Sequence, residues 1–120
     1  MAEASHLAFL QHGASVWNKW RSENPTFAPD LSEADLRGAN LMWFDLSRAN
    51  LAKANLSGAN LRWASFYGAD LTEADLSGAI LDCANLFWTN LSNANLTGAD
   101  LQRTVLWAAN IEPQPPLAAP

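Results

Sequence analysis

A leucine recurs every five residues over most of this chain, and that period is the strongest constraint on its fold. The series runs from Leu31 to Leu106, with Phe66 in one slot and Ile111 in the last. Alanine usually precedes each of these positions by two residues, and Asn or Asp stands between them. We name these positions the Leu site, the Ala site and the Asx site. The two residues after each Leu site are the first and second outer sites.

A period of five fits neither an α-helix nor a flat strand. A helix would spread the Leu sites around its circumference, and a strand would turn successive Leu sites to opposite faces. A chain that bends after every unit keeps every Leu and Ala inside, and Asx, Ser and Gly are residues that such bends accept. The pattern therefore predicts a solenoid with short straight sides, in which each unit packs on its neighbours.

The outer sites predict how many sides make one coil. Glycine in the second outer site recurs every twenty residues, which is four units, at Gly38, Gly58, Gly78 and Gly98. The same spacing aligns one Asx column as Asp35, Asn55, Asp75 and Asn95. Adjacent coils lie about 4.8 Å apart, so alternating Asp with Asn keeps like charges from stacking directly. We therefore expect a coil of four sides.

This succession of units resembles the pentapeptide repeat family, whose consensus is A(D/N)LXX. The resemblance covers residues 30–112, about seven tenths of the 120-residue chain. It implies an all-β solenoid, namely a right-handed quadrilateral β-helix of about four coils, which agrees with the four predicted sides. Membership of such a family says far more about fold than about function.

Residues 1–29 predict an N-terminal α-helical cap, because a solenoid must cover its open end. We expect helices in SHLAFLQH, with Ser5 as N-cap and Gly13 as the stop, and in ASVWNKWRSEN, ended by Pro25. Their expected apolar surface is formed by Leu7, Leu10, Val16, Trp17 and Trp20. Phe44 fills an Ala site in the first coil, so it should touch Trp17 or Trp20.

The two flanks of the repeat carry further information. The segment WNKWRSENP, with the PDLSEADL that follows, resembles leader segments that precede the repeats in bacterial members of the family, which implies a bacterial protein. Residues 113–120 form a Pro-rich C-terminal tail, PQPPLAAP, whose prolines cannot donate hydrogen bonds to another rung. This tail either caps the last coil or extends as a linker.

Composition limits the partners and the compartment. The net charge is −5 and both signs are mixed, which argues against direct binding to nucleic acid or to an anionic membrane. The single cysteine excludes an intrachain disulfide and fits a reducing compartment. The N-terminus lacks the pattern of a signal peptide, and no apolar run is long enough to span a bilayer. We expect a cytoplasmic protein.

Catalytic and metal sites are not expected. His6 and His12 are six residues apart, whereas helical metal ligands need three or four. Cys83 has no histidine within the repeats to activate it. The acidic residues fall on convex outer faces with Arg37 and Lys53 among them, where nothing excludes water. We therefore expect no enzyme activity and no cofactor.

Aromatic residues gather on two adjacent sides of the predicted coil. They form what we name the aromatic belt: Trp43, Trp63, Tyr67, Phe87, Trp88 and Trp107. The twenty-residue period stacks Phe87 between Tyr67 and Trp107, with Trp88 beside them. The Asx columns of the same two sides are interrupted at Ile80 and Val105.

Several roles for the aromatic belt remain open. The belt is expected to be an exposed contact surface for an unknown protein partner or for a second copy in a homodimer. Alternatively, it only stabilises the coil, or it stacks against carbohydrate or single-stranded nucleic acid. The favoured function is a non-enzymatic protein-interaction or scaffold module. The resemblance also admits a DNA-mimic modulator of a type II topoisomerase, like the family's gyrase-protecting members.

Overall fold

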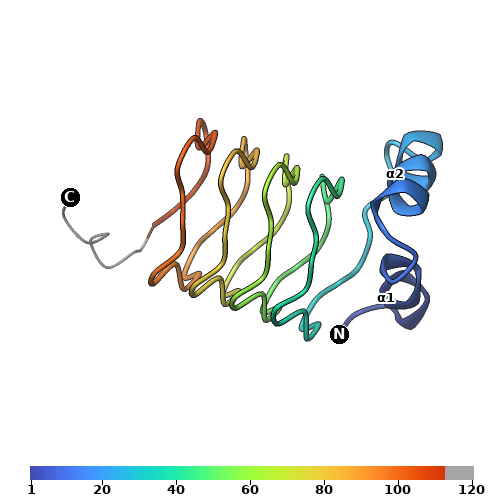
Figure 1. Ribbon diagram of the computed structural model, residues 1–120, viewed down its shortest axis with the longest axis horizontal. Coiled ribbons are helices and arrows are strands. Elements are labelled where there is room, and N and C mark those ends of the chain that lie inside the picture. Colours follow the sequence, from blue (N-terminus) through green and yellow to red (C-terminus); the bar gives the residue numbers. More distant parts are fainter. Residues whose placement is uncertain (113–120) are drawn as a thin grey trace.

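The computed structural model describes residues 1–112 and places two short helices at one end of a regular coil (Figure 1). Helix α1 spans Ala4–Leu10 and helix α2 spans Ala14–Glu23. After them the chain winds away from the helices in successive turns of similar size. The tail predicted for residues 113–120 lies outside the described residues.

Parallel bridges join residues twenty positions apart on every side of the coil. On its first, second, third and fourth sides in turn, the first coil pairs with the second at Asp30–Asn50, Asp35–Asn55, Asn40–Asn60 and Asp45–Ser65. The expectation of a four-sided coil is therefore confirmed. Each bridge is isolated and does not extend into a longer strand, because the chain turns again after every unit.

The hydrogen bonds of one bridge show how the coils are joined. The N–H of Leu31 donates to the carbonyl of Asn50 at 2.7 Å, and the N–H of Asn50 donates to the carbonyl of Pro29 at 2.8 Å. An Asx site thus directs both its N–H and its C=O toward the preceding coil. This pairing recurs through the coil, for example at Asn55, whose N–H donates to Ala34 and whose carbonyl accepts from Leu36.

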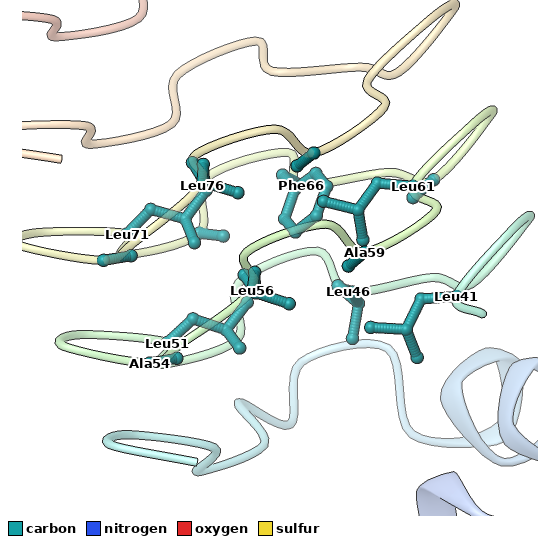
Figure 2. Packing of buried hydrophobic residues seen from close by; sticks show 14 of the residues in the cluster. Leu41, Leu46, Leu51, Ala54, Leu56, Ala59, Leu61, Phe66, Leu71 and Leu76 are labelled. Atoms are coloured by element: carbon teal, nitrogen blue, oxygen red, sulfur yellow. The ribbon is translucent and has the colours of Figure 1, made fainter. Parts of the chain in front are cut away.

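The Leu and Ala sites fill the inside of the coil. In the middle coils these side chains are fully buried, as at Leu51, Leu56, Ala54 and Ala59. Figure 2 shows Leu sites of successive coils standing over one another, with Phe66 in the column of Leu46. Because burial of a Leu side chain contributes about 1.5–3 kcal/mol, these columns provide the main stabilisation of the fold.

A tight turn at the outer sites ends each side. The N–H of Ala34 donates to the carbonyl of Leu31 at 3.2 Å, and the second outer residue Glu33 has a φ of 60°. A positive φ at this position is that of a type II turn, which favours glycine. The non-glycine residues at second outer sites adopt it too, with φ between 55° and 68°.

Where Asn or Asp occupies the Asx site, its side chain adds a hydrogen bond to the turn. Oδ1 of Asn55 accepts the N–H of Ser57 at 3.0 Å, and Oδ1 of Asp75 accepts the N–H of Ser77 at 2.9 Å. Asn and Asp both offer an acceptor to the N–H two residues on, which explains why they share the site. Ile80 has no such oxygen.

Some details predicted for the N-terminal helices are wrong. Helix α1 has Glu3, not Ser5, in the N-cap position, because the N–H of Glu3 is held by the carbonyl of Asp30 at 2.9 Å. The helix ends at Leu10, which leaves His12 beyond it. Val16 is 45% exposed and does not join the apolar surface, since α2 buries the face of its neighbour Trp17 instead.

The predicted contact between the helices and Phe44 is confirmed. The rings of Trp17 and Phe44 lie 6.2 Å apart, and both side chains are buried. Nε1 of Trp17 also donates to the carbonyl of Asp45 at 2.7 Å. The indole therefore packs on the end of the core and pairs with the first coil through its polar atom.

Two polar residues of α2 also hold the first coil, and sequence reasoning missed both. The side chain of Asn18 donates to the carbonyl of Trp43 and accepts the N–H of Asp45, each at 2.8 Å. The buried guanidinium of Arg21 donates to the carbonyls of Phe27 and Ser47. Burial lowers the pKa of Arg21. Arg21 follows Trp17 by four residues and Asn18 by three, and both spacings place side chains on a common face of a helix.

Candidate interaction surface

The aromatic column on the fourth side of the coil is stacked as the sequence predicts. Ring centroids of Tyr67 and Phe87 lie 5.4 Å apart with an interplanar angle of 2°. Phe87 and Trp107 lie 5.0 Å apart at 23°. Each ring comes from a first outer site, and the bridges between coils set the spacing of the column. Phe87 thus lies between the two other rings.

Trp88 extends this column sideways. Its ring lies 5.8 Å from Tyr67 and 5.5 Å from Phe87, tilted by 45° and 43°. Trp88 occupies a second outer site with a φ of 60°, a conformation that costs a bulky residue energy. Because its ring contacts both Tyr67 and Phe87, Trp88 widens the apolar surface beyond a single column.

The remaining belt residues form a separate pair on the third side. Trp43 and Trp63 stack at 5.1 Å with an interplanar angle of 3°. Within residues 1–112 no ring contact joins this pair to the Tyr67 column. The belt therefore consists of two aromatic clusters and is not one continuous ring stack.

The stacking decides which part of each ring faces solvent. In a parallel stack along the coil axis, the ring faces meet one another and the ring edges point outward. Exposure remains high at the four tryptophans: 57% at Trp43, 50% at Trp63, 59% at Trp88 and 70% at Trp107. Stacking against a sugar or a base needs a free ring face. A partner that approaches the column from the side therefore meets mainly ring edges. Trp107 is the last ring of the column.

A cation lies at the N-terminal end of the Tyr67 column. The guanidinium carbon of Arg48 lies 6.0 Å from the centroid of the Tyr67 ring, within the range of a cation–π contact. Arg48 also donates to the carbonyl of Pro25 at 2.9 Å, so its head group is held in place. The Tyr67 face is thus covered on both sides.

Beyond Trp63 the third side becomes polar. Arg103 donates from Nε and Nη2 to the two carboxylate oxygens of Asp82, at 2.9 and 2.6 Å. This pairing lowers the pKa of Asp82 and raises that of Arg103. Cys83 lies in the same column, with its Sγ 3.4 Å from Oδ1 of Asp82. The thiol therefore lies against a carboxylate that is already paired with Arg103.

The acidic columns are occupied by structural hydrogen bonds. The hydroxyl and the N–H of Ser77 lower the pKa of Asp75, and the side chain of Arg37 lowers the pKa of Asp35. Lowered values keep both carboxyls ionised, whereas a general acid needs a raised one. Asn55 bridges to both, so the two carboxylates are not adjacent.

The two histidines make structural contacts in the N-terminal region. Nδ1 of His6 accepts the N–H of Asp30 at 3.0 Å, and its ring lies 5.2 Å from Phe27. His12 packs its ring 5.9 Å from Phe9. Among the described residues no three His, Cys, Asp or Glu side chains gather as a metal site would require. In that same part of the chain, no helix has the length and apolar content to cross a bilayer.

Solved structures of similar proteins share this repeat. A pentapeptide repeat protein from the thylakoid lumen of Arabidopsis thaliana is 41% identical over 68% of this chain and 61% of its own, with a TM-score of 0.56. One from Nostoc PCC 7120 is 36% identical over 75% of this chain and 72% of its own, with a TM-score of 0.54.

A plasmid-mediated fluoroquinolone resistance protein is a more distant match. It is 17% identical over 71% of this chain and 54% of its own, with a TM-score of 0.41, which is too low to carry functional information. No curated protein sequence matches the chain significantly. The sequence model of pentapeptide repeats matches residues 45–82 and 84–112, in eight copies and over more than half of the chain. The chain belongs to the pentapeptide repeat family.

Proposed function

We propose that this protein is a non-enzymatic interaction or scaffold module that presents the aromatic belt on a rigid β-helix. One observation carries the proposal: the four tryptophans of the belt are 50–70% exposed, while the Leu and Ala sites behind them are buried. A contiguous exposed apolar patch on a protein surface usually marks a contact, and Trp and Tyr dominate binding hot spots.

The orientation of the rings favours a protein as the partner. Outward-facing ring edges and the tilted Trp88 make a ridged apolar surface, which another folded surface can match by shape. The partner is either a second copy of this chain or another protein. Nucleic acid and membrane are not proposed as partners, because the chain has a net charge of −5 and no basic face is evident in the sequence.

The finer architecture belongs to the same proposal. The coil is the right-handed quadrilateral β-helix of the family, and α1 and α2 cap its first turn. Residues 1–29 are the cap, residues 30–112 the β-helix and residues 113–120 a Pro-rich tail. A chain that lacks residues 1–29 should expose its first coil and aggregate, as measured by light scattering; the same oligomeric state as the full chain would contradict the capping role. A bacterial source and a cytoplasmic location are also part of the proposal, and fractionation of the source cells tests the location.

The test of the belt compares two sets of substitutions. Replacing Tyr67, Phe87, Trp88 and Trp107 by Ser should abolish self-association in light scattering, or capture of a partner in a pull-down. The matched control replaces Lys53, Glu73 and Asn93 by Ser, because these residues occupy second outer sites on another side at similar φ. Loss of binding in the control, or none in the belt variant, would sink the proposal.

The topoisomerase alternative has little support. A DNA mimic needs a long stripe of unpaired acidic charge, whereas here Asp35 pairs with Arg37 at 2.8 Å and Asp82 with Arg103 at 2.6 Å. The acidic columns also alternate with Asn. A gyrase supercoiling assay decides between the two functions, and protection of the enzyme by this chain would overturn our choice.

A further inference from the structure

The end of the coil that faces the helices is closed on two sides. Asx sites turn their N–H and C=O toward the preceding coil, and the first coil has none before it. At Asp30 the N–H donates to His6 and the carbonyl accepts from Glu3, at 3.0 and 2.9 Å. At Asp45 the N–H donates to Asn18 and the carbonyl accepts from Trp17, at 2.8 and 2.7 Å. On these sides the N-terminal residues replace a rung.

The other two sides of this edge are open. Among residues 1–112, the backbone N–H and C=O groups of Asp35 and Asn40 have no hydrogen-bond partner in the protein. Their side chains are used, since Oδ1 of Asp35 accepts the N–H of Arg37 and Oδ1 of Asn40 that of Met42. Two adjacent sides thus present a vacant rung, with both donors and acceptors in place.

A half-open cavity, lined by both apolar and polar atoms, lies beside the vacant rung. It has a volume of about 560 Å³, within the range of roughly 300–1,000 Å³ for ligand pockets. Its apolar lining comes from Leu7, Leu10, Leu36, Ala39, Leu41 and Phe44. Leu36 and Ala39 are only half-buried, whereas Leu56 and Ala59, their equivalents one coil later, are fully buried. The first coil therefore lacks the cover that each later coil receives.

We propose that this edge binds an extended peptide that supplies the missing rung. In the rungs already formed, an Ala-site carbonyl accepts from an Asx N–H, as Ala34 does from Asn55 at 2.9 Å. A Leu-site N–H donates to the Asx carbonyl, as Leu36 does to Asn55 at 2.8 Å. The occupant is thus a partner segment with Ala-Xaa-Leu units five residues apart, whose Ala and Leu side chains enter the cavity. This is strand addition at an open edge.

Charge and continuity both fit such a segment. The charged side chains lining the cavity are Asp35 and Arg37, and they pair with each other at 2.8 Å. The rim is therefore close to neutral and suits an uncharged stretch of chain. The vacant rung also continues the bridges Asp35–Asn55 and Asn40–Asn60, so the register of the peptide is set by the coil itself.

The test uses an acetylated, amidated peptide of sequence ANLSGANL, which carries no charge and copies residues 54–61, from the same two sides one coil later. Titrated into ¹⁵N-labelled protein, it should shift the amide signals of Asp35 and Asn40 saturably and slow their hydrogen exchange. The same peptide N-methylated at both leucines keeps its side chains but cannot donate to the two carbonyls. It should bind about tenfold more weakly.

Two variants separate this site from the aromatic belt and from unfolding. Ala39→Phe should fill the cavity and abolish peptide binding while the spectrum stays dispersed. Trp63→Ser should bind the peptide like the wild type, because Trp63 does not line the cavity. The proposal is overturned by absent shifts at Asp35 and Asn40 with millimolar peptide. Equal binding of the N-methylated peptide, or shifts centred on the belt, would overturn it too.

Discussion

Replacing Asn18 by Ala should loosen the first coil without unfolding the rest of the protein. The Asn18 amide acts as a surrogate rung, since it donates to the carbonyl of Trp43 and accepts the N–H of Asp45. Alanine can do neither. In a solenoid each unit interacts mainly with its neighbours, so the loss should stay near the end of the coil.

The magnitude follows from the two bonds that are lost. Both are 2.8 Å long, and a net contribution of about 0.5–1.5 kcal/mol is typical of each. The bond to Trp43 is exposed, so water replaces part of it. Alanine also forms helix better than Asn, which offsets about 0.5 kcal/mol. We expect a net local loss of about 1 kcal/mol, or about fivefold in the opening equilibrium.

Native-state hydrogen exchange measures this loss residue by residue. Protection of the Asp45 amide should fall about fivefold, while the Asp75 amide, which pairs with Ala54 at 2.9 Å, should stay unchanged. Lys19→Ala is the matched control, because Lys19 is exposed on the same helix and its side chain makes no hydrogen bond within residues 1–112. It should leave both amides protected.

Two results would refute this reasoning. Unchanged protection at Asp45 would mean that Asn18 does not act as a rung in solution. An equal fall at Asp45 and Asp75 would mean that the coil opens as one cooperative unit. In that second case the nearest-neighbour description of the coil would fail even though the hydrogen bond exists.

Three further predictions test the turns, the core and the Asx columns. Gly58→Ala should destabilise the protein by about 1 kcal/mol in urea unfolding, because its φ of +66° disfavours a Cβ, although within residues 1–112 an added Cβ would meet no non-neighbouring atom within 4 Å. Ser57→Ala, next to it, should be neutral. Thr89→Val should cost about 1 kcal/mol in the same assay, since the buried hydroxyl of Thr89 donates to the carbonyl of Phe66 at 2.6 Å; no change would show the bond to be dispensable. Acid should destabilise the coil: the folded pKa of Asp75 is lowered by Ser77, so its contribution is complete above the unfolded pKa of about 4 and is lost as pH falls through the folded value. Asp75→Asn should reduce this acid dependence of the urea midpoint, because the amide oxygen still accepts the Ser77 N–H; an unaltered profile would assign the dependence to other carboxyls.

The repeating part of the fold was predictable because the sequence spacing between two residues determines whether they are neighbours. A spacing of twenty residues was enough to place Phe87 between Tyr67 and Trp107, and the rings lie there. Phe44 was predictable for a related reason, since a large residue in an Ala site needs extra room, which the end of the coil provides. Periodicity thus converts sequence positions directly into neighbours.

The N-terminal helices offered no such rule. Their amphipathic pattern suggested which residues are apolar, but Val16 proved exposed because the angle at which α2 meets the coil selects the buried face. The roles of Asn18 and Arg21 depend on unpaired backbone groups of residues 43–47, which no pattern in the sequence reveals. The division of the belt into two clusters was also not predictable. The twenty-residue spacing gives the neighbours along one side of the coil, but it does not give the distance between rings on adjacent sides.

The contacts among the belt rings distinguish two hypotheses: that the belt binds a partner, and that it only stabilises the coil. Within residues 1–112, the Phe87 ring contacts three other rings, whereas the Trp107 ring contacts that of Phe87 alone and is 70% exposed. An aromatic pair contributes about 0.5–1.5 kcal/mol beyond its buried area. If the belt only stabilises the coil, Phe87→Ser must lower the stability far more than Trp107→Ser does. Neither substitution should then change the binding of a partner. If the belt is a contact surface, the opposite order is expected for binding. The most exposed ring, Trp107, then contributes most to binding and least to folding. A Trp107 variant that keeps its stability and loses its partner is therefore the result that coil stabilisation alone cannot produce.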